Sequence, residues 1–271
     1  MKKIAAAATV VVLVSVSVFL LNQDGSGPKI AVDDESDLIP SSLETPNHDP
    51  LSLEATSPPS EMSTRSVADG MDEDALRELQ RSVKDWQHAH GYFDLSGNMR
   101  FNNSYTPLDE DALKTLAETG DMFAAMILAG RLLAKGDAKG YVDNHRLAAV
   151  LGSTNSISQI GYHYRRKPSD NDPLSERERA IESTAWLLVS AQMGDLSGHY
   201  GYSESIRRYA LGDDESYRAI CDRATRIRNE LAARRADYGL PDYDDDPLPM
   251  LDQILAESKD VLVDLPARCS I

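Results

Sequence analysis

Aromatic and cationic side chains gather in one short run, residues 162–167 (YHYRRK), within a chain that is otherwise strongly acidic. Tyrosine and arginine are common anchors at protein interfaces, and a guanidinium pairs well with a carboxylate. The candidate contacts with an acidic protein partner are therefore Tyr162, Tyr164, Arg165 and Arg166. The alternative is that these basic residues only complement the dipole of a helix that ends here.

Two other groups of residues, a histidine pair and an acidic run, carry metal-binding side chains, but their positions do not match the spacing of known metal-binding motifs. His88 and His90 offer two imidazoles, yet no third ligand stands at a recognised spacing, and an imidazolium is favoured at a helix C-terminus. The acidic run 242–246 is similar to the start of a calcium loop, but Pro247 stands where glycine is needed and Gln253 where a bidentate glutamate belongs. We interpret the two groups as a helix end and an acidic turn, and expect no metal and no cofactor. Weak calcium binding at the acidic turn stays open.

The chain carries no sequence motif of a known catalytic site. It lacks a Gly-x-Ser-x-Gly elbow, a phosphate-binding loop and a dinucleotide fingerprint. We therefore expect a binding protein rather than an enzyme and assign no catalytic residue. An active site assembled from distant residues such as His163, His199 and Glu182 is the alternative.

The two cysteines, Cys221 and Cys269, form a candidate disulfide. In an oxidising compartment a bridge between them would tie the C-terminal tail back to the fold and constrain the unfolded chain. Cys221 lies on an apolar helical stripe, so a buried free thiol is the competing interpretation.

The overall charge restricts the class of partner. The chain of 271 residues contains 44 Asp and Glu and 28 Lys and Arg, so its net charge is −16. Binding to nucleic acid depends on neutralising phosphates, so this charge argues against a nucleic-acid partner and in favour of protein partners. Hydrophobic residues make up 41% of the chain, enough for one core of ordinary size.

The N-terminus has the pattern of a membrane anchor. Lys2 and Lys3 precede an uncharged run from Ile4 to Leu21, which is long enough to cross a bilayer as a helix. The positive residues predict that the N-terminus lies in the cytoplasm and the rest outside it. We expect an uncleaved signal-anchor; a signal peptide cut near Gly25 or Gly27 is the alternative.

Residues 22–70 have the composition of a linker. Ten acidic residues stand there against Lys29 and Arg65, and six of the chain's thirteen prolines fall in this segment. Such a segment buries too little apolar surface to offset its loss of conformational entropy on folding. We expect it to be disordered and to extend the folded part away from the membrane.

After Gly70 the apolar residues recur with helical spacing. A first helix carries Leu76, Leu79, Val83 and Trp86 on one face and ends near Gly91. We expect a second helix to begin at Thr106-Pro107, a third to run from Asp172-Pro173 to Gly194, and a fourth to cover 214–238. Strand signals are almost absent, and residues 261–263 fit either a short strand or an extended tail.

An internal repeat becomes visible when the chain is aligned on Gly120, Gly152 and Gly194, which are 32 and 42 residues apart. Each glycine has an alanine three residues before it, and small, large and small side chains four, eight and nine residues after it. The aligned residues are Ala117, Ala149 and Ala191; Ala124, Ser156 and Gly198; Leu128, Ile160 and Tyr202; and Ala129, Gly161 and Ser203. The pattern predicts three units, each with two helices joined by a tight turn, that stack to bury a continuous core.

These units resemble the Sel-one-like repeat, a relative of the tetratricopeptide repeat. The matching residues are Ala117, Gly120, Asp121 and Leu128, then Ala149, Gly152, Ile160 and Gly161, and finally Trp186, Ala191, Gly194 and Asp195. The resemblance covers about residues 108–206, and Ala112 and Asn144 replace the family's tryptophan in the first two units. It implies a scaffold that binds proteins, often in bacterial envelopes, without a cofactor or catalytic residues.

Together these patterns predict an all-α protein, a short solenoid of antiparallel helical hairpins with flanking helices behind a membrane helix and a disordered linker. The expected divisions are the anchor 1–21, the linker 22–70, an N-terminal flanking helix in 71–107, the repeats in 108–210, and a long helix with a tail in 211–271. We expect it to mediate protein–protein interaction on the extracytoplasmic side of the inner membrane. An envelope enzyme or cell-wall-binding protein, and a module that associates with itself, are the alternatives.

Overall fold

The computed structural model describes residues 72–92, 104–166, 173–243, 246–258, 262–263, 265 and 269. In this part of the chain every regular element is a helix and no strand occurs, so the prediction of an all-α fold is confirmed there. The helices are α3 (Glu73–Ala89), α5 (Glu110–Glu118), α6 (Met122–Ala134), α7 (Ala138–Val150), α8 (Thr154–Arg165), α9 (Glu176–Gln192), α10 (Leu196–Arg208), α11 (Asp214–Asp237) and α12 (Leu251–Glu257). The expected membrane helix and linker lie outside the described residues.

Glycine turns join the helices of three successive pairs, α5 with α6, α7 with α8, and α9 with α10. Gly120, Gly152 and Gly194 have φ angles of 102°, 118° and 78°, which lie in a region that strains any residue with a Cβ. The residue after each glycine then caps the next helix by accepting a backbone N–H bond with its side chain. The capping residues are Asp121, Ser153 and Asp195.

The aligned small residues lie where helices approach most closely. A Cβ at Gly198 would collide with the backbone nitrogen of Ala191, and one at Gly161 would lie 2.7 Å from Cγ of Leu187. The large aligned side chains Leu128, Ile160 and Tyr202 are buried, as are all three aligned alanines that precede the turns. The alternation of small and large residues therefore follows from close packing of neighbouring helices.

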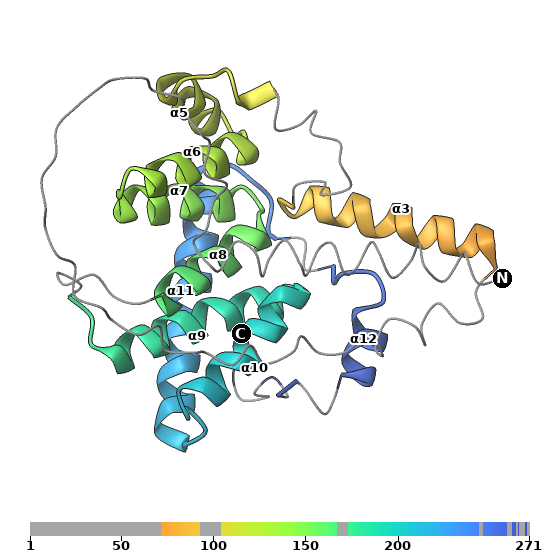
Figure 1. Ribbon diagram of the computed structural model, residues 1–271, viewed down its shortest axis with the longest axis vertical. Helices are drawn as coiled ribbons and strands as arrows, with labels where there is room; N and C mark the ends of the chain where they lie inside the picture. Colours follow the sequence, from red (N-terminus) through yellow and green to blue (C-terminus); the bar gives the residue numbers. More distant parts are fainter. Residues whose placement is uncertain are drawn as a thin grey trace, which may run out of the picture.

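Helix α9 lies at the centre of the larger core, packed against α8, α10 and α11. Helix α11 crosses α9 and also reaches α7, as its course in Figure 1 shows. Its apolar stripe of Ile220, Ala224, Ile227 and Leu231 is buried in this core. The face of α7 and α9 that α11 covers is therefore filled by the chain itself.

The first pair of helices has a smaller core of its own. Leu113 and Ala117 of α5 pack with Phe123 and Leu128 of α6, and Ala148 of α7 completes this cluster. Helix α7 thus belongs to both cores, because its Ala149 and Val150 pack into the larger one.

Two predicted helix starts were wrong. Helix α5 begins after Asp109, whose side chain accepts the N–H of Ala112 at 2.8 Å, and not at Thr106. Helix α9 begins after Ser175, which forms a reciprocal capping box with Glu178, and Asp172 lies outside the described residues. In both cases a stronger cap stands a few residues after the Thr-Pro or Asp-Pro signal, and the helix starts there.

The other boundaries follow the sequence pattern more closely. Helices α3 and α11 end at or next to the positions that the periodicity predicts, and Gly91 and Gly239 follow them with positive φ angles. Of the segment 261–263, the described Leu262 and Val263 lie in no strand, and the N–H of Val263 donates to Oγ of Ser203 at 2.9 Å.

Candidate functional site

Charged and aromatic side chains from four helices meet beside α9, and we call this group the arginine cluster. Its members are Arg146 of α7, Tyr164 of α8, Arg179, Glu182 and Trp186 of α9, and Arg223 of α11. The three residues on α9 are three and four positions apart, so one side of that helix presents them together. Packing of α8 and α11 against α9, and of α7 against α8 and α11, brings the other three side chains to this side.

Glu182 holds the cluster together. Its Oε2 accepts from Nε of Arg223 at 2.5 Å, and its Oε1 accepts from Nη2 of Arg223 at 2.8 Å and from Nε1 of Trp186 at 2.9 Å. A bidentate pair of this kind is strong and directional, and here both side chains are mostly buried. The bond to Glu182 is the main reason that the pKa of Arg223 is raised.

Arg146 lies over the indole of Trp186, with its Cζ 5.6 Å from the ring centroid. Its Nε is buried and has no hydrogen-bond acceptor, and no carboxylate among the described residues forms an ion pair with its guanidinium. Trp186 itself is only 1% exposed, so Arg146 covers a ring that is otherwise part of the core. The stacking positions the guanidinium without neutralising it.

The charged side chains of the cluster all affect the pKa of Tyr164. Burial raises the pKa of its hydroxyl, and Glu182 raises it further, while Arg146, Arg223 and Arg179 act in the opposite direction. The guanidinium of Arg179 lies 6.0 Å from the Tyr164 ring centroid and donates to the backbone oxygen of Arg166 at 2.7 Å. Three arginines thus lie around Glu182, and one of them, Arg223, also pairs with Glu230 at 3.6 Å, in a chain whose net charge is −16.

An open groove between α9 and α11 adjoins the cluster. Its lining includes Glu182 and Arg223 together with the apolar Leu174, Ile181 and Ala219. Glu178, Asp222 and Arg226 are also part of the lining. The combination of an apolar strip, fixed charges and a guanidinium suits recognition of a peptide better than acid–base chemistry, because both oxygens of Glu182 are already bonded.

The four residues expected to contact a partner have different environments. Tyr162 is buried and its hydroxyl donates to the backbone oxygen of Ser197 at 2.8 Å. The side chain of Arg165 is only 6% exposed and pairs with Glu204 of the same chain at 2.6 Å. Tyr164 is half-buried in the arginine cluster, and Arg166 is exposed. Of these four residues, Arg166 is exposed and Tyr164 is partly exposed, while the other two side chains point inward.

The three residues considered for an active site each have different partners. Glu182 is engaged with Arg223 and Trp186, whereas the His163 ring contacts Tyr141 and Tyr164. His199 interacts with the backbone of Ala191, which lies nine residues along α9 from Glu182 and hence about 13 Å away at the helical rise. Burial lowers the pKa of His199, with Asp195 acting in the opposite direction.

A buried polar network, which the sequence does not indicate, surrounds the turn at Gly194. The hydroxyl of Tyr92 lies 2.7 Å from both carboxylate oxygens of Asp195 and 2.7 Å from Oγ of Ser197. Burial and the charge of Asp195 raise the pKa of Tyr92 well above its usual value. Tyr92 and Asp195 are 103 residues apart, so no local pattern could pair them, although the Gly-Asp turn already marks Asp195 as a cap.

Chain segments on both sides of the helical pairs dock against the same turns. Beyond the end of α3, the backbone oxygen of His90 accepts from the N–H of Asn155 at 3.3 Å. From the C-terminal side, Leu248 donates its N–H to the oxygen of Gly194 at 3.1 Å, and Trp86 donates its Nε1 to the oxygen of Asp246 at 2.9 Å. These contacts stabilise the stack rather than form a reactive site.

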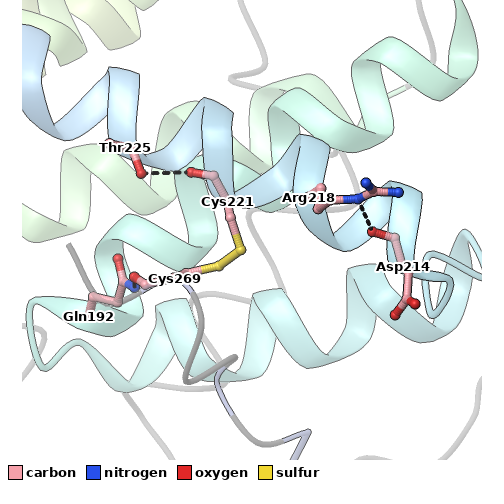
Figure 2. The surroundings of a disulfide bond; sticks show 6 residues. All are labelled: Gln192, Asp214, Arg218, Cys221, Thr225 and Cys269. Carbon is pink, nitrogen blue, oxygen red and sulfur yellow. Dashed lines mark hydrogen bonds between the residues drawn. A yellow bond between two sulfur atoms is a disulfide. The ribbon is translucent and has the colours of Figure 1, made fainter.

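Cys221 and Cys269 form a disulfide, with their Cα atoms 5.1 Å apart (Figure 2). The backbone oxygen of Cys269 accepts from Nε2 of Gln192 at 2.8 Å, which links the end of α9 to the same point. The bridge holds residue 269 against α11, and Cys269 is 2% exposed.

The two histidines near the end of α3 contact other parts of the chain. Nδ1 of His90 lies 2.8 Å from the oxygen of Trp86, and His88 packs against Phe123. Across the described ranges, no group of three or more His, Cys, Asp or Glu side chains is placed to hold a metal ion. Asp244 and Asp245 of the acidic turn lie outside those ranges.

No helix within the described part of the chain is long and apolar enough to cross a bilayer. No protein-family model matches the chain, and it matches neither a curated protein nor a solved structure.

Proposed function

We propose that this protein is a membrane-anchored, extracytoplasmic scaffold that binds another protein, and that its helical pairs form a short solenoid of the Sel-one-like kind. The membrane anchor at 1–21 and the linker at 22–70 are inferred from the sequence pattern alone. The protein-binding role is argued from the described helices.

The observation that carries the proposal is the recurrent geometry of α5–α6, α7–α8 and α9–α10. Each pair turns at a glycine with positive φ, continues with a capping Asp or Ser, and buries its aligned small residues, of which Gly161 and Gly198 lie in close contact with α9. Arrays of such pairs present an extended surface built from many helices, which suits recognition of another protein.

The proposed binding surface differs from the one that the resemblance implies. Helix α11 packs across α7 and α9, so the face that would be concave in a longer array is covered there by the chain's own helix. What stays accessible beside it is the edge formed by the arginine cluster and the groove between α9 and α11. We place the partner at this edge.

In-cell photo-crosslinking tests the proposal. A photoreactive amino acid replaces Arg226, which is exposed and lines the groove, and in a matched control it replaces Arg81, which is exposed on α3. We expect one saturable partner at position 226, captured both by the full chain and by a form that starts at Met71 and is exported to the same compartment. No specific capture by either form at position 226, or equal capture at position 81, would contradict the proposal.

The membrane anchor needs its own measurement. Intact mass spectrometry of the protein from the membrane fraction distinguishes an uncleaved chain that begins near Met1 from one cut near Gly25 or Gly27. We expect the uncleaved mass, because no small-residue cleavage pattern follows the apolar run.

A further inference from the structure

We propose that Arg146, held over Trp186, is the recognition point for a carboxylate of an acidic segment in the partner protein. This inference rests on the proposed protein-binding function and adds the chemistry of recognition and the residue that performs it. It is argued from three features of the arginine cluster: an incomplete set of hydrogen bonds, a rigid platform and a local excess of positive charge.

The hydrogen bonds of Arg146 are incomplete. A guanidinium has five N–H donors, and a buried donor without an acceptor is costly. The Nε of Arg146 is buried without an acceptor, and no carboxylate in the described ranges pairs with this side chain. The side chain as a whole is only partly buried, so an incoming carboxylate would reach its terminal Nη groups, accept two parallel bonds from them and supply a negative charge beside the guanidinium.

The platform under Arg146 is rigid. Trp186 is 1% exposed, and its Nε1 is bonded to Glu182 at 2.9 Å. Glu182 is in turn fixed by two bonds from Arg223. Glu182 is directed at Arg223 and Trp186, and among the described residues it forms no ion pair with Arg146. The site is therefore preorganised for a carboxylate from outside.

The charges around the site favour a short acidic segment over a polyanion. Arg146, Arg179 and Arg223 outnumber the two carboxylates that pair within the cluster, Glu182 and Glu230. Outside the cluster, however, Glu178 and Asp222 border the groove and the whole chain carries −16. These negative charges would repel a nucleic acid or a long acidic polymer. One or two carboxylates on a peptide are short enough to contact the arginines without approaching the acidic residues.

Fluorine NMR tests the inference directly. The chain has two tryptophans, so the full-length protein labelled with 5-fluorotryptophan in detergent micelles gives one resonance for Trp186 and one for Trp86. The probe is a short, end-blocked peptide of alternating glutamate and glycine, titrated to millimolar concentration; the matched control peptide carries glutamine in place of glutamate. We expect the acidic peptide to shift the Trp186 resonance, the glutamine peptide to leave it in place, and the Trp86 resonance not to move with either.

Substitutions then assign the effect to one side chain. Arg146→Gln should weaken the response to the acidic peptide by about tenfold or more, which corresponds to about 1.4 kcal/mol. Arg146→Lys keeps the charge but loses the fork, and should weaken it less. Arg81→Gln makes the same change in charge on α3, where Arg81 pairs only locally with Glu78, and should have no effect. An unmoved Trp86 resonance in each variant shows that the fold is retained.

Three outcomes overturn the inference: an acidic peptide that does not shift Trp186, an Arg146→Gln variant that responds like the wild type, or inorganic phosphate that shifts Trp186 as strongly as the peptide. The crosslinking experiment separates this failure from failure of the proposed function. If the wild type captures a partner at position 226 and Arg146→Gln captures it equally well, the scaffold proposal stands and only the role of Arg146 is wrong.

Discussion

The turns at Gly194 and Gly120 have nearly the same sequence and conformation but very different surroundings. Both glycines have positive φ angles, 78° and 102°, and both are followed by an aspartate that caps the next helix. At Gly120 an added Cβ would meet no atom within 4 Å, whereas at Gly194 it would collide with the backbone of Pro247. The first turn is open and the second is covered by a chain segment from far along the sequence.

The tyrosines beside these turns show the same contrast. Tyr105 donates to Asp121 and remains partly exposed, with a pKa raised to about 12 by burial and by Asp121. Tyr92 donates to Asp195, and that carboxylate is 1% exposed and also bonded to Ser197. The comparison teaches that a Gly-Asp turn fixes the local backbone, while the segments that dock on it determine how much it contributes to stability.

Loss of the disulfide should produce the largest difference between the two turns. Cys221 and Cys269 are 48 residues apart and enclose the segment that carries Pro247, so replacing both with alanine should cost about 4 kcal/mol in the chain-entropy model. Urea unfolding measures this loss, and hydrogen exchange should increase at the Gly194 turn and not at the Gly120 turn. Equal increases at both turns would show that the bridge acts on the whole stack. As a control, the denatured but unreduced wild type should present no reactive thiol.

Substituting the two glycines compares the turns directly. Gly194→Ala combines a positive φ with a collision against Pro247 and should lower the free energy of unfolding by about 3 kcal/mol. Gly120→Ala has only the strained φ and should lower it by about 1 kcal/mol. Equal losses in urea unfolding would mean that the segment around Pro247 yields without cost, and the contrast between the turns would be lost.

Removing the tyrosine hydroxyls should have a smaller effect in the same direction. Tyr92→Phe takes one donor from a buried carboxylate and should cost about 2 kcal/mol, whereas Tyr105→Phe at the more exposed turn should cost about 0.5 kcal/mol. Thermal unfolding of the two variants gives the comparison. A larger loss for Tyr105→Phe would contradict the view that burial determines the contribution of each turn.

Acidification should test whether the two turns unfold together. Burial and the nearby His163 lower the pKa of His145, on the helical pair between the turns, to about 3. As the pH falls through 6.5, the unfolded chain binds a proton at His145 and the folded chain does not. The free energy of unfolding therefore decreases, by about 1.4 kcal/mol between pH 7.5 and pH 5.5. Burial lowers the pKa of His199 as well, which acts with the same sign.

Replacing His145 is the control for this pH dependence. His145→Gln should reduce the decline between pH 7.5 and pH 5.5 and leave the smaller part due to His199, since that range lies above the titration of most carboxylates. We expect hydrogen exchange at both turns to increase together, because α7 contributes to both cores. An increase at one turn alone would show that the first pair of helices opens independently.

The sequence predicted the turns better than it predicted the candidate site. Periodicity and the aligned glycines located the helical pairs, because apolar spacing and a glycine turn are both read from a few neighbouring residues. The run at 162–167 also pointed to a region of arginine and tyrosine side chains, but it could not show that Arg165 turns inward to Glu204. Arg146 and Arg223 had no signal at all, because each is an ordinary arginine on a polar stretch of helix until Trp186 and Glu182 are brought beside it.

What the sequence by itself determined is the helical character of the described chain, the position of its glycine turns and the small residues at its close contacts. These follow from steric limits on the backbone and from the spacing of apolar side chains, which act over a few residues. Only the tertiary structure decided that α11 covers α7 and α9, that Pro247 closes the Gly194 turn, and that Arg146 rests on Trp186 without a carboxylate in the described chain. Those contacts join residues dozens of positions apart, and their geometry depends on how whole helices pack rather than on any local preference.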